Sequence, residues 1–230
     1  MKMALFSDVH GNITGLEAVF GKIDQLGGVE QSFCLGDMLG GSGGTDEVYD
    51  LLTERNVQMV RGNHEELVLD FEANEHKVQD QWRDHMTKEI AWVHEHLSDE
   101  YKMLVANLPL HLEVEAVPGR KLFLCHAGPK DPWAWVCAPQ TKREMLKEAF
   151  GDIDADVVAR GHFHGHHIRK LDEKLLLNVA SVGVRQDGLS AFTLLEFRQD
   201  DWIVQQHLVP YDVQQEQDLI RRKGTPQPQF

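Results

Sequence analysis

The chain has 230 residues and a net charge of −14, with 42% hydrophobic and 26% charged residues. These values are ordinary for a globular protein and fit one large domain with its own hydrophobic core. Since an acidic surface repels a phosphate backbone, they argue against an extended nucleic-acid-binding surface.

The start of the chain and the cysteines bear on where the protein works. The start, MKMALFSDVHGN, has one basic residue and a short apolar run, so it resembles neither a secretory signal nor a membrane span. Cys34, Cys125 and Cys137 form no C-x-x-C pair, so a zinc–thiolate site is not indicated. A sparse and odd set of cysteines fits a reducing compartment, and we expect a cytoplasmic protein without membrane partners.

The first sixty residues alternate between expected strands and helices. Short apolar runs predict strands at 2–7, 31–35 and 57–60. Apolar spacing and helix-start residues predict helices at 13–26 and 45–55. This order is typical of a sheet with parallel strands.

The rest of the chain divides into a helical part and a strand-rich part. Residues 65–108 are expected to be helical, and Pro109 ends that run. Strands are expected at 111–117, 121–125, 156–160, 174–179, 190–197 and 201–209, with one helix at 141–150. The chain has no repeat or linker, so we expect a single domain over 1–230. Residues 211–230 are its tail, and the polar, proline-containing end from 221 is expected to be loose.

Side chains that can bind metals follow five of the expected strands. In chain order they are Asp8 and His10, then Asp37, then Asn63, then His126, and finally His162 and His164. Ligands of open α/β sheets gather beyond the carboxyl ends of the strands, so these groups are expected to meet. His162 and His164 are two residues apart, and in an extended segment both would point toward the same centre.

Seven donors are too many for one tetrahedral ion but suit two ions if one carboxylate bridges them. Two carboxylates, four imidazoles and one amide oxygen suit manganese, iron, cobalt, nickel or zinc better than calcium, which prefers oxygen ligands. Each residue also has a simpler interpretation, since Asp and Asn are common in turns and histidine is common at surfaces. Together, these simpler interpretations leave the coincidence of five strand ends unexplained.

Other polar residues lie outside this pattern. His166 and His167 are expected to be surface groups or neighbours of the site. The histidines of the helical part are expected to face solvent, and two arginines that flank the motifs are expected at the surface. These residues are His76, His85, His94 and His96, and Arg61 and Arg160.

The blocks DVH, GDM, GNH, CHAG and GHFH, in this order, resemble the five-block signature of the calcineurin-like metallophosphoesterases. The resemblance covers nearly the whole chain, and FSDVHGNITGLEAVF, LGDMLGG and RGNHEE are similar to the small bacterial branch of that superfamily. It implies an α/β fold in which two mixed β-sheets form a sandwich flanked by helices. Residues 65–108 would form a helical cap insert over the site and set the choice of substrate.

The resemblance also implies a role for each site residue. His64 would bind no metal and would lie beside the scissile phosphate as a general acid or transition-state stabiliser. The metal ligands would divide between two divalent transition-metal ions, with Asp8, His10 and His164 on the first, Asn63, His126 and His162 on the second, and Asp37 bridging both.

The implied activity is hydrolysis of a phosphomonoester or phosphodiester without a covalent enzyme intermediate. A hydroxide bridging the two metals would attack phosphorus, and His64 would protonate the departing alkoxide. The substrate would be a small phosphorylated molecule, with nucleotides among the candidates. Trp133 and Trp135, which follow His126 in HAGPKDPWAW, are weaker candidates for substrate contacts.

Two alternatives stay open. Some relatives keep this fold as protein scaffolds and typically lose site residues, whereas every position is filled here. RGNHE also resembles protein Ser/Thr phosphatases and diadenosine-tetraphosphate hydrolases, but those carry an arginine in a longer second block where this chain has GDMLGGSGG. A further departure is NVASVG, in which Val179 and Ala180 stand where the bacterial branch commonly has Pro and Gly.

Overall fold

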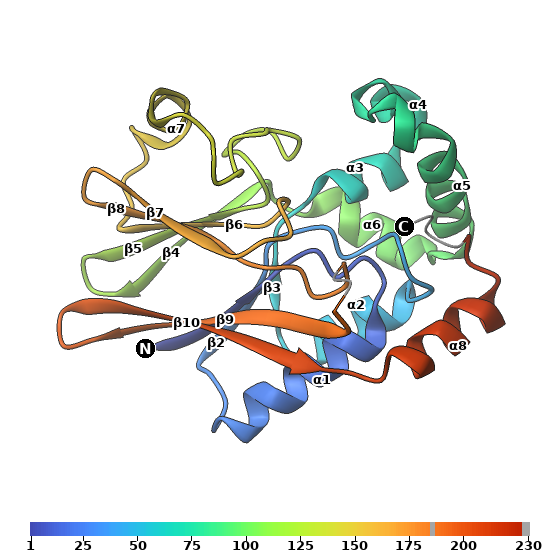
Figure 1. The fold of residues 1–230 in the computed structure, drawn as a ribbon, viewed down its shortest axis with the longest axis horizontal. Coiled ribbons are helices and arrows are strands. Elements are labelled where there is room, and N and C mark those ends of the chain that lie inside the picture. Colours follow the sequence, from blue (N-terminus) through green and yellow to red (C-terminus); the bar gives the residue numbers. More distant parts are fainter. Residues whose placement is uncertain (185–186, 227–230) are drawn as a thin grey trace.

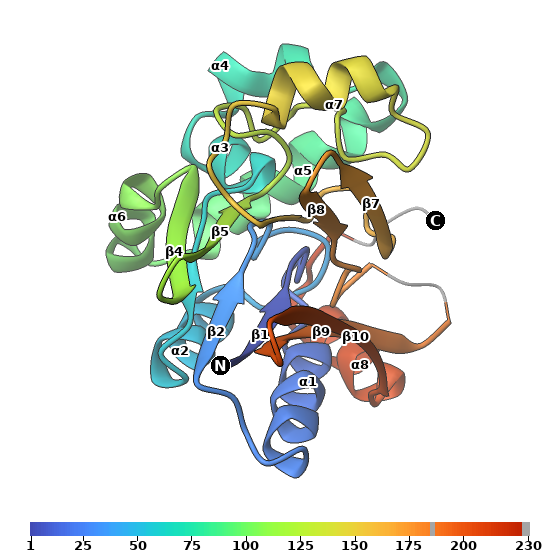
Figure 2. The same ribbon diagram turned by 90° about the vertical axis from the view of Figure 1, so that its left-hand side faces the viewer.

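Two five-stranded mixed β-sheets form the centre of the protein (Figure 1). The computed structural model describes residues 1–184 and 187–226. The sheets pack face to face and helices cover their outer faces, so the predicted fold class is confirmed. Figure 2 shows the two layers from the side.

The first sheet contains the strands predicted near the start of the chain and the two long strands near its end. Its strand order is β10-β9-β1-β2-β3. β1, β2 and β3 run parallel, whereas β9 is antiparallel to both β1 and β10. The strands are β1 (Lys2–Phe6), β2 (Gln31–Cys34), β3 (Gln58–Met59), β9 (Leu189–Arg198) and β10 (Asp201–Pro210).

The second sheet has the order β4-β5-β6-β8-β7. β5, β6 and β8 run parallel, and the edge strands β4 and β7 are antiparallel to their neighbours. The strands are β4 (His111–Val117), β5 (Arg120–Cys125), β6 (Val157–Arg160), β7 (His167–Leu171) and β8 (Lys174–Asn178). β7 was not predicted from the sequence, because this edge strand is polar and four of its five residues are exposed or half-buried.

The helices lie in three places. α1 (Ile13–Gln25), α2 (Asp46–Glu54) and α8 (Val213–Lys223) lie on the side of the first sheet, and α7 (Arg143–Phe150) lies over the second (Figure 1). The predicted helical insert forms α3 (Asn63–Leu69), α4 (Phe71–Asn74), the 3-10 turn η1 (Glu75–Lys77), α5 (Asp80–His96) and α6 (Asp99–Asn107). Within the described residues, no helix is both long enough and apolar enough to span a bilayer.

The strand β1 is buried on both faces, and its side chains alternate between two hydrophobic clusters. Met3 and Leu5 point into the space between the sheets, where they meet residues such as Leu124 and Leu177 of the second sheet. Ala4 and Phe6 point to the other face and pack with the helices. This burial explains the continuous apolar run in the sequence, which is typical of parallel strands.

The two sheets are tied together at the end of β1. Ser7 forms a parallel bridge with Ser181, which follows β8. The amide of Val182 donates to the Ser7 carbonyl at 3.0 Å, and the Ser181 hydroxyl donates to the Asp8 carbonyl at 2.7 Å. These bonds bring the carboxyl ends of the parallel strands of both sheets to one place.

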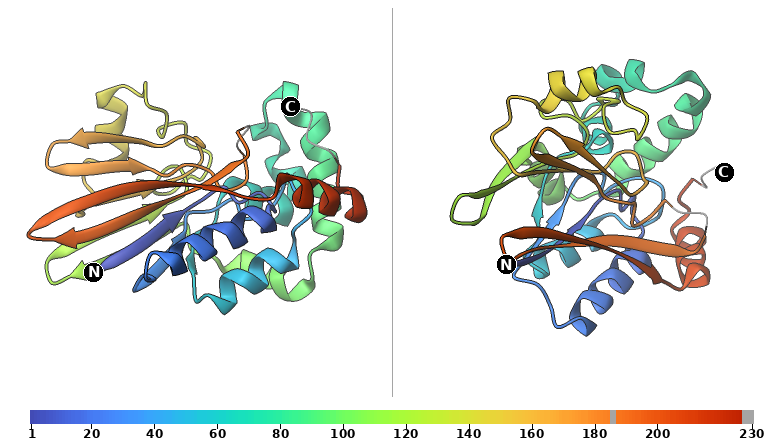
Figure 3. Two further views of the ribbon diagram at one scale, coloured as in Figure 1. Left: turned by 60° about the horizontal axis from the view of Figure 1, so that its bottom comes forward. Right: turned by 60° about the vertical axis from the view of Figure 1, so that its left-hand side comes forward.

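Two expectations from the sequence differ from the structure. Residues 213–223 of the tail form α8, which lies beside α1 (Figure 3), so the start of the stretch expected to be loose is helical; residues 227–230 lie outside the described residues. Arg160 was expected at the surface but is fully buried. Its guanidinium lies 5.0 Å from the Phe150 ring and donates to the Val136 carbonyl at 2.8 Å, so it joins β6 to α7 and the loop before it.

The contact between α8 and α1 gives a stability prediction. Glu216 is buried, and its carboxylate accepts a hydrogen bond from the Thr14 amide in the first turn of α1 at 3.1 Å. Glu216→Ala should lower the free energy of unfolding by about 1–3 kcal/mol, because a buried amide loses its acceptor. Urea denaturation measures the change, and Gln217→Ala, at an exposed position of the same helix, is the control. Equal stability of the two variants would contradict a structural role for the tail.

Candidate metal centre

The seven predicted metal ligands lie together at the carboxyl ends of five strands. Six of them are buried or nearly so, and the side chain of His164 is 35% exposed. Three groups of neighbouring side chains have nitrogen and oxygen atoms within 4.8 Å of one another, which suits shared metal ions. The groups are Asp8 with His10 and His164, His10 with Asp37 and His64, and Asp37 with His126 and His162.

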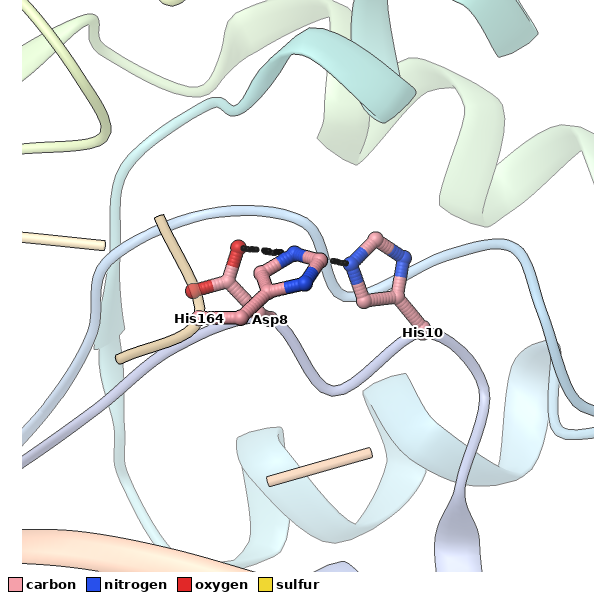
Figure 4. A group of neighbouring side chains, drawn as sticks. All are labelled: Asp8, His10 and His164. Carbon is pink, nitrogen blue, oxygen red and sulfur yellow. Dashed lines mark hydrogen bonds and ion pairs between the residues drawn. The ribbon is translucent and has the colours of Figure 1, made fainter. Parts of the chain in front are cut away.

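Asp8, His10 and His164 form one side of the centre (Figure 4). Nε2 of His164 lies 3.4 Å from Oδ1 of Asp8 and 3.2 Å from Nε2 of His10. The carboxylate of Asp8 also accepts from the His162 amide at 3.1 Å. These three side chains come from two distant loops, and their donor atoms face one another.

Asp37, Asn63 and His126 form the other side. Nε2 of His126 lies 3.2 Å from Oδ2 of Asp37 and 3.0 Å from Oδ1 of Asn63. Nδ1 of His126 bonds the Leu35 carbonyl at 2.7 Å. That contact orients the ring and leaves Nε2 for the centre, as is usual for a metal-binding histidine.

Asp37 lies between the two sides. Its Oδ2 is 3.9 Å from Nε2 of His10 and 3.2 Å from Nε2 of His126, so one carboxylate faces donors of both groups. The ring of His162 lies 5.1 Å from that of His126, and among the described residues its Nε2 is buried without a hydrogen-bond partner. A buried and unpartnered imidazole nitrogen beside two carboxylates fits a site for divalent metal ions.

Most of these residues have a left-handed backbone conformation that residues other than glycine rarely adopt. Asp8, His10, Asp37, His162 and His164 all have φ between 48° and 65°. The segment with His162 and His164 is therefore not extended, and the expected reason for their convergence was wrong: both side chains reach the centre from left-handed turns. Such strain persists only where the surroundings enforce it, and it clusters at functional sites.

Two of the imidazoles are held neutral. Burial and the neighbouring His64 lower the pKa of His10 to about 3. Burial and the neighbouring His126 lower the pKa of His162 to about 4. Only neutral imidazole can donate a lone pair to a metal, so both rings are ready to act as ligands at neutral pH.

The other two imidazoles are paired with carboxylates. Burial disfavours charge on His126, but Asp37 beside it raises its pKa to about 9. Burial likewise opposes charge on His164, and Asp8 raises its pKa. Burial would also raise the pKa of both carboxyl groups, but these histidines lower it, so Asp8 and Asp37 stay ionised. The centre therefore contains two ionised carboxylates paired with two imidazoles, and a bound cation would take the place of the imidazole protons as their partner.

Comparison with known proteins identifies the family. The calcineurin-like phosphoesterase superfamily domain matches residues 1–200. The chain belongs to this superfamily.

Relatives and similar structures agree with this assignment. An uncharacterized protein of Methanocaldococcus jannaschii is 28% identical over 98% of this chain and 94% of its own length. The crystal structure of a hypothetical protein from Pyrococcus horikoshii OT3 has a TM-score of 0.84 at 18% identity and covers 98% of this chain and 94% of that one. A metallophosphoesterase from Sphaerobacter thermophilus has a TM-score of 0.76 at 21% identity, with 98% and 95% covered.

A cavity of about 430 Å³ opens onto the centre of this phosphoesterase domain. Its floor includes His10, Asp37, Asn63, His162 and His164. The helical insert supplies one wall through residues 77–79 and α5, and the loop after His126 supplies another through Trp133 and Trp135. The cavity has the size and the mixed polar and apolar lining that are typical of small-molecule sites.

His64 lies at the edge of the cavity, next to the centre. Its ring is 4.5 Å from that of His10, and its amide donates to Oδ1 of Asp37 at 2.9 Å. His166 and His167 belong to none of the three groups of neighbouring donors found among the described residues.

Two polar residues of α5, His85 and Glu89, line the cavity but were not predicted as part of the site. His85 was expected to face solvent. His85 taken alone, on a polar helix, does not indicate a position in the cavity. The pair His85 and Glu89, four residues apart on one helix face, was the available signal.

Glu65, which was also missed, organises the loop of Asp37. Its carboxylate accepts from the amides of Asp37, Met38 and Gly62 at 2.9, 2.8 and 2.8 Å. The last of these bonds caps the start of α3, because the side chain of Glu65 in the first turn accepts from the backbone amide of the N-cap residue Gly62. Gly62 is required here, since a Cβ at this position would lie 2.1 Å from Oδ1 of Asp37.

The role of Glu65 can be tested through metal binding. Glu65→Ala should weaken divalent-metal affinity by about 10–100-fold, because residues that hold a metal ligand in place typically contribute that much. Equilibrium dialysis with Mn²⁺ measures the affinity. The control is Glu72→Ala, at an exposed position of α4. Unchanged affinity in Glu65→Ala would show that the Asp37 loop keeps its form without this carboxylate.

Proposed function

We propose that the protein is a phosphoesterase that uses two divalent transition-metal ions to hydrolyse a small phosphorylated substrate. One observation carries the proposal: every donor that the family signature requires is present, and the donors lie together beside one cavity that five of them line. A scaffold protein has no need to keep two buried carboxylates and four imidazoles facing one another, because burying such groups is costly.

The donor atoms divide naturally between two ions. Asp8, His10 and His164 would hold the first ion, and Asn63, His126 and His162 would hold the second. Asp37 would bridge them, which its position between His10 and His126 supports. The mixture of nitrogen and oxygen donors favours manganese, iron, cobalt, nickel or zinc.

When bound, the two ions supply positive charge for the phosphoryl oxygens and lower the pKa of water so that a nucleophile exists near neutral pH. The residues of the chain do the remaining work. Asp8 holds the ring of His164 in place, and Asp37 holds the ring of His126 in place. His64 lies at the cavity edge and would donate a proton to the leaving oxygen of the substrate.

The walls of the cavity favour a substrate with a flat, apolar part such as a nucleobase. Trp82 and Trp135 line the cavity and are 42% and 59% exposed, so their rings are accessible to a ligand. Trp133 is held in place: its indole N–H donates to Glu66 at 2.8 Å, and Nζ of Lys77 lies 5.4 Å from its ring. Stacking on tryptophan suits the base of a nucleotide. Phosphoprotein substrates fit less well, because GDMLGGSGG lacks the arginine of protein phosphatases.

The experiment that tests the function is metal removal and reloading. Protein stripped with a chelator should not hydrolyse phosphomonoesters or phosphodiesters, and Mn²⁺, Co²⁺, Ni²⁺ or Zn²⁺ should restore turnover. In the reloaded protein, His64→Ala should lower kcat by about 10²–10⁴-fold, the usual contribution of a general acid. Metal content should stay unchanged in this variant.

Asp37→Asn is the companion variant, because it should lose metal as well as activity. Turnover by the stripped protein with chelator present would contradict the proposed mechanism. Full activity of His64→Ala would show that His64 is not the general acid.

The tryptophan wall gives a prediction on substrate choice. Trp135→Ala should raise KM for nucleotide substrates by about 5- to 150-fold, since stacking of a base on an aromatic ring is worth about 1–3 kcal/mol. Trp135→Phe keeps a ring and should stay close to the wild type. Steady-state kinetics with a nucleotide and with a small alkyl phosphoester separates the two effects. An equal change for both substrates would mean that Trp135 does not contact the base.

A further inference from the structure

The carboxylate of Glu89 lies beside His64 and has no place among the metal ligands. Glu89 is on α5 of the helical insert, and only 5% of its side chain is exposed. Its Oε1 lies 3.9 Å from Nδ1 of His64, and its Oε2 lies 3.1 Å from Nε2 of His85. Burying a carboxylate costs folding free energy unless the charge is paired. The position of Glu89 between two histidines therefore suggests a functional role.

The loop of the second motif is shaped to let these groups meet. A Cβ at Gly40 would lie 2.5 Å from Nδ1 of His64 and 2.7 Å from Oε1 of Glu89. Gly40 also has φ of +95°, a conformation that other residues rarely adopt. The backbone of Gly41 also helps to lower the pKa of Glu89. Only glycine at position 40 leaves room for His64 and Glu89 on the same side of the loop.

The hydrogen-bonding needs of His64 point to the same partner. Nδ1 of His64 is buried and has no hydrogen-bond partner within 1–184 and 187–226. Its Nδ1 can therefore be satisfied by the carboxylate 3.9 Å away. This separation is longer than a hydrogen bond, and catalytic hydrogen bonds commonly tighten when substrate binds.

His85 stabilises the ionised form of Glu89. Burial would raise the pKa of Glu89, but the hydrogen bond with His85 and the nearby His64 lower it. The same hydrogen bond raises the pKa of His85. Glu89 is thus ionised. Its Oε2 is bonded to His85, and its Oε1 can accept a hydrogen bond from His64.

We propose that Glu89 is a positioning residue for His64: it accepts a hydrogen bond from Nδ1 and so holds Nε2, the opposite ring nitrogen, toward the leaving oxygen of the substrate. His85 braces the carboxylate. During cleavage of the P–O bond, the proton on Nε2 passes to the leaving oxygen, and His64 becomes a neutral imidazole that keeps the proton on Nδ1, hydrogen-bonded to Glu89. This inference rests on the proposed phosphoesterase function and assigns the helical insert a part in the chemistry.

The kinetic test uses two esters that share the phosphoryl group and differ in the leaving group. An alkoxide needs a proton as it departs, whereas p-nitrophenolate does not. Glu89→Ala should lower kcat for the alkyl ester by about 10–100-fold, part of the 10²–10⁴-fold that a general acid contributes. It should change kcat for the nitrophenyl ester far less and leave KM unchanged.

Matched variants separate positioning from folding. Glu89→Gln keeps the shape and an acceptor oxygen, so it should fall between the wild type and Glu89→Ala. Glu95→Gln, at an exposed position of the same helix, is the control. In a His64→Ala background, Glu89→Ala should cause no further loss, since the two residues act as one unit. Equal losses on both esters, or an additional loss in the His64→Ala background, would overturn the proposal.

A measurement without turnover keeps this inference separate from the proposed function. In zinc-loaded protein, ¹⁵N–¹H NMR should detect a slowly exchanging proton on Nδ1 of His64, assigned by its absence in His64→Ala. Glu89→Ala should lose this signal and Glu89→Gln should retain it in weakened form. The same signal in Glu89→Ala would overturn the positioning role. Absence of turnover in the wild type with this NMR pattern intact would contradict only the proposed function.

Discussion

The burial of two carboxylates is the constraint on which the rest of the site depends. Asp8 and Asp37 are almost fully buried, and a buried charge is tolerated only with partners of opposite polarity. Each carboxylate has a histidine within 3.4 Å and a backbone amide within 3.2 Å. Satisfying the two acids therefore forces five separate loops to meet at one point. A pair of cations at that point would replace the imidazole protons as partners of the two carboxylates.

This convergence is reached at a conformational cost that the sheets offset. Left-handed backbone at a non-glycine residue costs on the order of 1 kcal/mol or more, and Asp8, Asp37 and His162 all have it. The turns persist because each of them directly follows a parallel strand with buried faces. The bridge between Ser7 and Ser181 joins the two sheets beside them. The sandwich thus acts as the rigid support that catalytic geometry needs.

The sequence predicted the fold and the site correctly where a local residue pattern is typical of only one kind of element. Apolar runs followed by acids or histidines located β1, β2, β5 and β6 and the residues beyond them. Features that depend on tertiary contacts could not be read in this way. The edge strand β7 has little buried apolar surface, and Arg160 is buried through contacts with Phe150 and Val136 from other parts of the chain. Glu89 was not predicted as a site residue, because a helix with few apolar residues does not reveal which face is covered.

In the proposed mechanism, the helical insert links the choice of substrate to the chemistry. Only Glu89, Ile90 and Val93 of the 17-residue helix α5 are buried, so one short stretch anchors it. The same helix presents Trp82 to the cavity, seven residues from Glu89 and on the same helix face. A shift of α5 would move the stacking wall and the carboxylate beside His64 together. Binding energy gained at the tryptophans can therefore stabilise the arrangement in which His64 is correctly oriented, as expected when remote contacts contribute to catalysis.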